Sequence, residues 1–212
     1  MDEVAAVPTA DTASMAVVHV SGPLGCGKTC FGIDIAKLFA ECGCVRVVNT
    51  DDLIAPKSAL AKELAEFELE QLDNTETRYV AHWKKAFGEL LDKEIRDAQE
   101  ARPPLKVLLF VGCLDHYAPP GIMPLHLKGS VYRFCMKRHI THLLAMYYTR
   151  FRVEFKDDDG YWDDLYNGEN YIPSSEEYID NAVALTEWHL SNGYAHRTPE
   201  EIRAVIEELV NK

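Results

Sequence analysis

The chain has 212 residues, the size of one domain with room for a sizeable hydrophobic core. Hydrophobic residues make up 47% of it and charged residues 26%, values that exclude a disordered or fibrous protein. The formal net charge of -12 argues against broad nucleic-acid binding, because such a chain repels a phosphate backbone. Its apolar runs are far shorter than the roughly 20 residues needed to cross a bilayer, so we expect no membrane association.

The start of the chain and the cysteines indicate where the protein works. Residues 1–14 are small, polar and acidic, and they have neither the basic start nor the apolar stretch of a secretory signal. We expect a flexible leader at 1–14, a single domain at 15–212 and a cytoplasmic location. The 6 cysteines form no pair of CxxC motifs and no small-domain framework, which predicts reduced thiols.

Strand-like and helix-like segments alternate in the first half of the chain. Short β-branched or apolar runs predict strands, whereas apolar residues at helical spacing predict helices, the first of them ended by Gly43. The predicted strands of this half cover 15–20 and 45–48, and the predicted helices cover 29–40, about 58–72 and about 75–100.

The second half continues the alternation. Capping boxes predict two helix starts, one at Ser174 with Glu177 and one at Thr198 with Glu201. Alternating strands and helices imply right-handed crossovers, and hence a three-layer α/β/α sandwich around a mainly parallel sheet of about five strands. The remaining predicted strands cover 107–111, 131–136 and 194–196, and a further helix covers 139–155.

The segment between the first predicted strand and helix has the pattern GxxxxGK[ST], met at Gly22, Gly27, Lys28 and Thr29. In this motif, the P-loop, backbone N–H groups hold phosphate oxygens, the lysine adds positive charge, and the hydroxyl binds magnesium. We therefore expect ATP and Mg²⁺ as cofactors and a P-loop NTPase fold. The expected nucleotide-binding residues are Gly22, Pro23, Leu24, Gly25, Cys26, Gly27, Lys28, Thr29 and Cys30.

Two acids, Asp51 and Asp52, follow the second predicted strand. The segment from Val47 to Pro56 resembles the corresponding part of uridine kinases and nicotinamide riboside kinases, and it is similar to a shorter acidic motif of shikimate and gluconate kinases. The resemblance implies a carboxylate beside the acceptor hydroxyl. Either acid qualifies as this catalytic residue, and Asp51 also qualifies as a magnesium ligand, directly or through water. The alternative is a pair of acids that caps a helix.

A basic segment lies between Lys128 and Arg152 and contains no acid, which makes it the natural neighbour of a phosphate in an acidic chain. Its end, with the acidic and aromatic stretch 157–163, resembles the arginine-rich lid of nicotinamide riboside kinases. The resemblance implies a mobile lid at about 138–172, in which Arg150 or Arg152 stabilises charge on the transferred phosphoryl group. The alternative is a solvated basic helix face.

One position departs from the pattern of these kinases. Val111-Gly112 stands where they carry a glutamate before a glycine, and Asp115 is a candidate to replace that acid from the next loop. We hypothesise an ATP-dependent kinase that transfers the γ-phosphoryl group to a small-molecule acceptor: a nucleoside, a nucleotide or a ribosyl compound. The alternatives are a nucleotide-binding module with decayed catalysis that acts through a partner, and an acceptor-independent ATPase switch. The oligomeric state stays open.

Overall fold

The computed structural model describes residues 15–53, 76–112, 127, 130–153 and 174–212. In these ranges the chain forms five strands and six helices, and the strands lie close to the predicted positions. The elements are β1 (Ala16–Ser21), α1 (Lys28–Leu38), β2 (Val45–Asn49), α2 (Thr50–Leu53), α4 (Glu76–Gln99), β3 (Val107–Val111), β4 (Val131–Met136), α5 (Ile140–Val153), α7 (Ser175–Ser191), β5 (Ala195–Arg197) and α8 (Pro199–Asn211).

The five strands form one parallel sheet in the order β2-β3-β1-β4-β5, which confirms the predicted parallel α/β architecture. The first strand of the chain lies at the centre of the sheet. Val18, for example, is opposite Leu109 of β3 on one side and Tyr132 of β4 on the other. Because all strands run in the same direction, their carboxyl ends and the segments that follow them meet at one edge.

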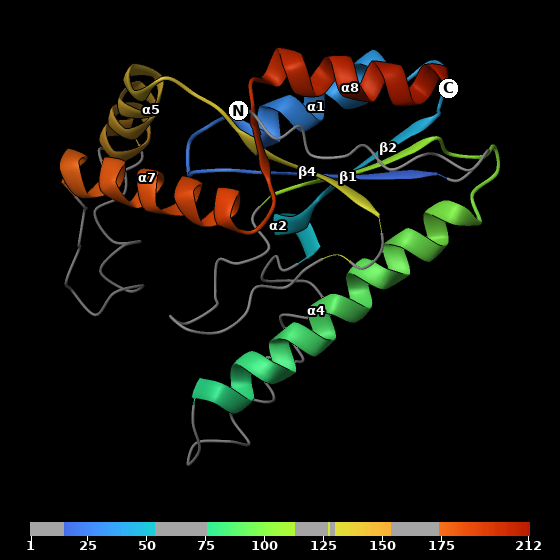
Figure 1. Ribbon diagram of the computed structural model, residues 1–212, viewed down its shortest axis with the longest axis horizontal. Coiled ribbons are helices and arrows are strands. Elements are labelled where there is room, and N and C mark those ends of the chain that lie inside the picture. The colour runs from blue at the N-terminus through green and yellow to red at the C-terminus, as the bar shows by residue number, and fades with distance from the viewer. Residues whose placement is uncertain (1–14, 54–75, 113–126, 128–129, 154–173) are drawn as a thin grey trace, which may run out of the picture.

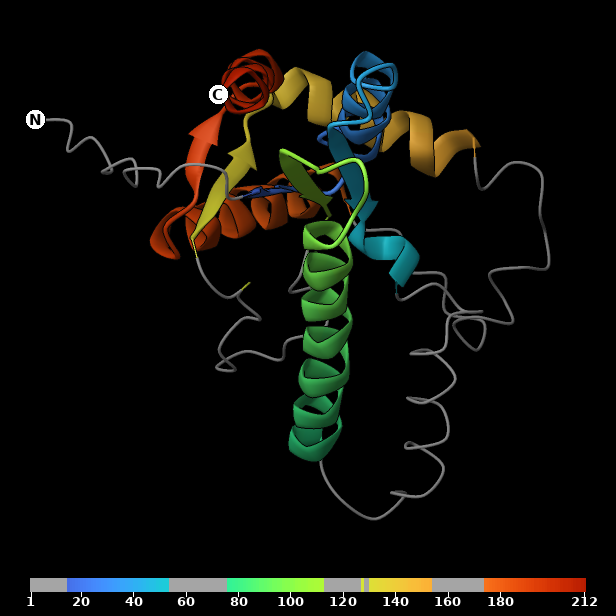
Figure 2. The ribbon, with the colours of Figure 1, turned by 90° about the vertical axis from the view of Figure 1, so that its right-hand side faces the viewer.

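Helices cover both faces of this sheet (Figures 1 and 2). The strand β3 shows why, since every one of its side chains is buried. Leu109 belongs to the hydrophobic cluster formed with α1 and α8, whereas Leu108 and Phe110 belong to a second cluster formed with α4. Such a strand needs apolar neighbours on both sides, so it appears in the sequence as a continuous apolar run.

Two helix starts follow the predicted capping boxes. At α7, the Ser174 hydroxyl accepts a 3.1 Å hydrogen bond from the Glu177 N–H, and the Glu177 carboxylate accepts one of 2.7 Å from the Ser174 N–H. Thr198 caps α8 in the same way. The end of α1 differs from the prediction: the helix stops at Leu38, and Gly43, with φ 60°, lies in the turn beyond it.

Some expectations fall on other parts of the chain. The leader at 1–14, the helix predicted at about 58–72, Asp115 and the stretch 157–163 lie outside the described residues. Within the described ranges, no helix has the length and apolarity that a membrane span requires.

The prediction of reduced thiols is wrong for two cysteines. Cys42 and Cys44 form a disulfide with their Cα atoms 5.2 Å apart. This bond spans a single residue in the turn between α1 and β2, a spacing shorter than that of a CxxC motif. Elsewhere in the described chain, Cys26 and Cys30 are not in disulfides.

Candidate functional site

Residues 22–27 form a glycine-rich loop between the carboxyl end of β1 and the first turn of α1. Gly25 has φ 73°, and a Cβ atom there would collide with the Tyr178 hydroxyl. Gly27 has φ 90° and is the N-cap of α1. Backbone in this left-handed region favours glycine, so the pattern of glycines corresponds to the shape of the loop.

The N-terminus of α1 has no capping side chain and no acid in its first turn. The first N–H groups of a helix have no partner within the helix, and the helix dipole makes this end favourable for an anion. Thr29 and Cys30, in the first turn, are exposed. The start of α1 therefore offers hydrogen-bond donors and an accessible hydroxyl.

Lys28, the first residue of α1, folds back over the glycine-rich loop. Its Nζ atom donates hydrogen bonds of 2.8 Å to the Gly22 carbonyl and 2.9 Å to the Pro23 carbonyl. These neutral acceptors do not cancel the charge of the ammonium group. The loop thus carries a positive charge that can attract an anionic group.

Arg138 brings a second positive charge to the loop. It lies just after β4 and is half-buried, and its Nε atom donates a 2.9 Å hydrogen bond to the Cys26 carbonyl. One terminal nitrogen of its guanidinium group lies 3.4 Å from where a Cβ atom of Gly27 would stand. The sequence placed this arginine in a basic segment without assigning it to the site. Its position at the carboxyl end of a parallel strand was the available signal.

The opposite side of the loop is held by α7. The Tyr178 hydroxyl donates a 2.6 Å hydrogen bond to the Leu24 carbonyl, and the Tyr178 side chain is buried. A buried hydroxyl with a backbone acceptor fixes the local backbone. Residues distant in the sequence therefore fix the loop at two of its carbonyl groups, those of Leu24 and Cys26.

Beneath the loop lies a buried polar network that the sequence did not predict. His19 Nε2 is 2.9 Å from the Gly112 carbonyl and His19 Nδ1 is 2.8 Å from the Tyr194 hydroxyl. Since a carbonyl can only accept, we assign the proton to Nε2, and Nδ1 accepts from Tyr194. The network joins the carboxyl end of β3 to the segment between α7 and β5 through the central strand.

His189 of α7 makes the second half of the network. Its Nδ1 atom donates to the Leu185 carbonyl at 2.6 Å, and its Nε2 atom accepts from the Ser21 hydroxyl at 2.7 Å. Burial lowers the pKa of His19 to about 3 and the pKa of His189 to about 4. Both imidazoles are therefore neutral near pH 7, and Ser21, the last residue before the loop, is fixed to α7.

The acidic pair lies in the short helix α2, directly after β2, and both carboxylates are exposed. Gly112 has φ 140°, and a Cβ atom on it would collide with the Thr50 hydroxyl and lie 3.4 Å from Oδ1 of Asp51. Asp51 therefore lies against the carboxyl end of β3. In the sheet, β3 lies between β2, which the acid follows, and β1, which the loop follows.

The resemblance to the kinase lid names two further arginines. Arg150 and Arg152 belong to the last turn of α5, and their side chains lie outside the described residues. Within the described ranges, no group of three or more His, Cys, Asp or Glu side chains could hold a metal ion.

No protein-family model matches the chain, and no curated protein matches it.

Proposed function

We propose that the chain is a P-loop NTPase acting as an ATP-dependent small-molecule kinase, with a nucleoside, nucleotide or ribosyl compound as acceptor. The observation that carries the proposal is the GxxxxGKT segment in a loop between a central parallel strand and a helix, with Lys28 and Arg138 both bonded to that loop. Two cations, glycine backbone and an uncapped helix N-terminus suit a polyphosphate.

The sheet order supports this location. The chain leaves β1 toward the β2 edge and leaves β3 toward the β4 edge, so the order reverses between these neighbouring strands. In open α/β sheets, ligands bind at the carboxyl ends of the strands at such a reversal. The glycine-rich loop follows β1, and Asp51 lies at the end of β3. Both are therefore beside the expected crevice.

Each residue of the site would have its own role in phosphoryl transfer. ATP supplies the phosphoryl group. Lys28 and the loop N–H groups hold its phosphates, and Arg138 and the lid arginines Arg150 or Arg152 neutralise charge that develops during transfer. Asp51 orients the acceptor hydroxyl and takes its proton. We assign this role to Asp51 because its carboxylate lies beside Gly112, at the carboxyl end of β3.

Magnesium fits this arrangement as an ion that arrives with the nucleotide. It keeps several waters and binds through one or two protein groups plus phosphates, so a cluster of acids is not required. The exposed Thr29 hydroxyl and the Asp51 carboxylate are the groups that would hold it.

The test follows ADP release from ATP and Mg²⁺ with pooled nucleosides, nucleoside monophosphates, ribosylated vitamins and sugar acids. We expect acceptor-dependent ADP from the wild type and from Lys37→Ala, a matched control on the exposed side of α1, but not from Lys28→Ala. ADP release that ignores the acceptor would instead support the ATPase switch.

The second candidate is a nucleotide-binding module without turnover. The observation that favours it is the buried, aliphatic Val111 at the end of β3, where the resembling kinases carry an acid. A module of this kind predicts equal thermal stabilisation by ATP with and without Mg²⁺, whereas an active kinase predicts a larger shift with the metal.

A further inference from the structure

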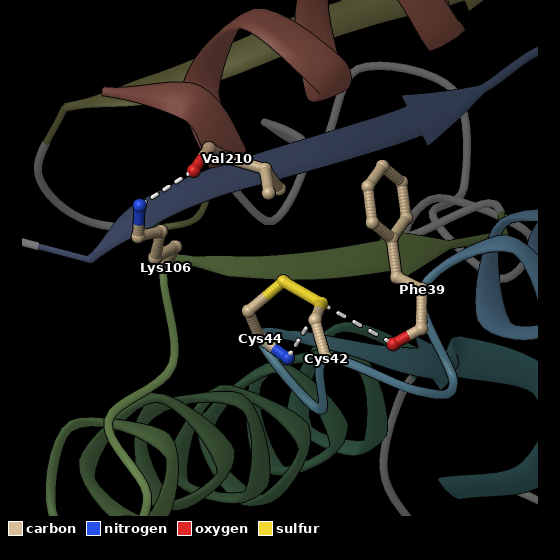
Figure 3. Close-up of a disulfide and its surroundings, with 5 residues drawn as sticks. All are labelled: Phe39, Cys42, Cys44, Lys106 and Val210. Atoms are coloured by element: carbon tan, nitrogen blue, oxygen red, sulfur yellow. Dashed lines mark hydrogen bonds between the residues drawn. A yellow bond between two sulfur atoms is a disulfide. The ribbon is translucent and has the colours of Figure 1, made fainter.

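The turn between α1 and β2 presents a disulfide to solvent (Figure 3). Cys42 and Gly43 are exposed and Cys44 is half-buried. Gly43 has φ 60°, and no described atom apart from those of its two chain neighbours lies within 4 Å of where its Cβ would stand. A dissolved thiol can therefore approach the sulfur–sulfur bond.

This bond contributes little to the stability of the fold. A disulfide stabilises mainly by closing a long loop, and this one joins residues only two positions apart. Backbone hydrogen bonds hold the same turn independently: the Gly43 N–H donates to the Phe39 carbonyl at 3.1 Å, and the Lys106 N–H donates to the Cys44 carbonyl at 2.8 Å. Neither hydrogen bond involves a sulfur atom, so both remain available when the disulfide is reduced.

The surroundings of Cys42 suit the reduced state as well. The Cys44 N–H points at Cys42 Sγ from 3.3 Å, so it stabilises negative charge on that sulfur. The Phe39 carbonyl lies 3.4 Å from the same sulfur, where it accepts a hydrogen bond once Cys42 is a protonated thiol. Oxidised and reduced forms therefore both fit one backbone conformation.

We propose that Cys42-Gly43-Cys44 is a reversible redox site whose substrates are dithiols and disulfides. A thiolate of an external dithiol attacks Sγ of Cys44, the sulfur–sulfur bond breaks, and its electron pair leaves on Cys42, which the Cys44 N–H stabilises. The second thiol of the reductant then displaces Cys44 from the mixed disulfide. In sum, two electrons and two protons pass to the chain, and the dithiol becomes a disulfide.

The site is separate from the proposed nucleotide site. Cys44 directly precedes β2, so the disulfide lies at the amino-terminal edge of the sheet, whereas the glycine-rich loop lies at the carboxyl-terminal edge. Neither proposal depends on the other, and each has its own measurement.

The experiment equilibrates the full chain with mixtures of reduced and oxidised glutathione, quenches with acid, and alkylates the free thiols. Mass spectrometry of the peptide that contains Cys42 and Cys44 then counts alkyl groups. We expect the number of alkyl groups to change from none to two as the mixture becomes more reducing. The ratio of dithiol to disulfide should be proportional to the squared concentration of reduced glutathione divided by the concentration of oxidised glutathione. Cys30, an exposed single thiol, is the internal control and gains at most one glutathione.

Rapid quenching with limiting glutathione locates the attacked sulfur, and we expect the adduct on Cys44. Far-UV circular dichroism should be the same before and after reduction. The proposal is overturned if the bond resists millimolar dithiothreitol in the folded chain, if the cysteines stay reduced in excess oxidised glutathione, or if reduction unfolds the protein.

Discussion

Arg138 and Cys26 are 112 positions apart in the sequence, yet the guanidinium Nε of one donates a 2.9 Å hydrogen bond to the carbonyl of the other. The contact places a half-buried cation against a loop that already holds the Lys28 ammonium. Two like charges bonded to one loop repel each other, and a bound anion would relieve the repulsion.

Arg138→Ala should therefore weaken binding of ATP with Mg²⁺. Charge-assisted hydrogen bonds contribute about 1.5–3 kcal/mol, which corresponds to a rise in Kd of about 10- to 100-fold. Isothermal titration calorimetry measures the Kd of each variant. Arg203→Ala, which removes an exposed arginine of α8, is the matched control. Equal affinities of the wild type and Arg138→Ala would remove this arginine from the site.

Asp51 and Asp52 can be distinguished by substitution. Asp51→Asn should lower kcat by about 100-fold or more, because a general base acts in the transfer step. Asp52→Asn is the matched control. It removes the same charge from the same helix, but the contact with Gly112 is made by Asp51 and not by this carboxylate. Its kcat should stay near the wild-type value, and the reverse pattern would assign the role to Asp52.

Gly112→Ala should destabilise the fold. The backbone there has φ 140°, and the added Cβ would collide with the Thr50 hydroxyl, so we expect the free energy of unfolding to fall by about 3 kcal/mol. Gly193→Ala is the control, since it also has positive φ but meets no described atom within 4 Å. Urea unfolding should show a loss of about 1 kcal/mol for this variant. Similar losses in the two variants would contradict the contact with Thr50.

The buried histidines predict a loss of stability in acid. Their native pKa values, about 3 for His19 and about 4 for His189, lie below the ordinary value of 6.5. Between pH 6.5 and 4 the unfolded chain therefore binds more protons than the native chain, and the free energy of unfolding falls as the pH falls. Each histidine contributes a slope of up to about 1.4 kcal/mol per pH unit.

His189→Gln tests this prediction through the slope rather than the stability itself. In urea unfolding at several pH values, its slope should be smaller than that of the wild type by the share of one histidine, about 1.4 kcal/mol per pH unit at most. Parallel pH profiles for the wild type and His189→Gln would show that His189 titrates normally.

The parts of the fold that the sequence predicted are those with a local cause. Val107–Val111 was recognised as a buried strand because both of its faces need apolar cover. The starts of α7 and α8 were recognised because a capping box is complete within four residues. The glycine-rich loop was found for the same reason, since its glycines are required by its own backbone.

The missed residues act across the fold. Tyr178 meets Leu24, and His189 meets Ser21, only once α7 packs beneath β1. No local pattern encodes such a contact, although a histidine inside the otherwise apolar strand β1 was a visible sign of buried polar chemistry. The Cys42–Cys44 bond was missed for another reason: its spacing was shorter than the motifs considered.

The central position of β1 also determines when the protein can fold. Its neighbours β3 and β4 begin at Val107 and Val131, so β1 leaves the ribosome long before either of them. At bacterial to eukaryotic translation speeds the delay is on the order of ten seconds. A nascent chain that ends after β2 holds two apolar strands that do not pair with each other. Until β3 emerges to join them, neither strand has its neighbour in the sheet.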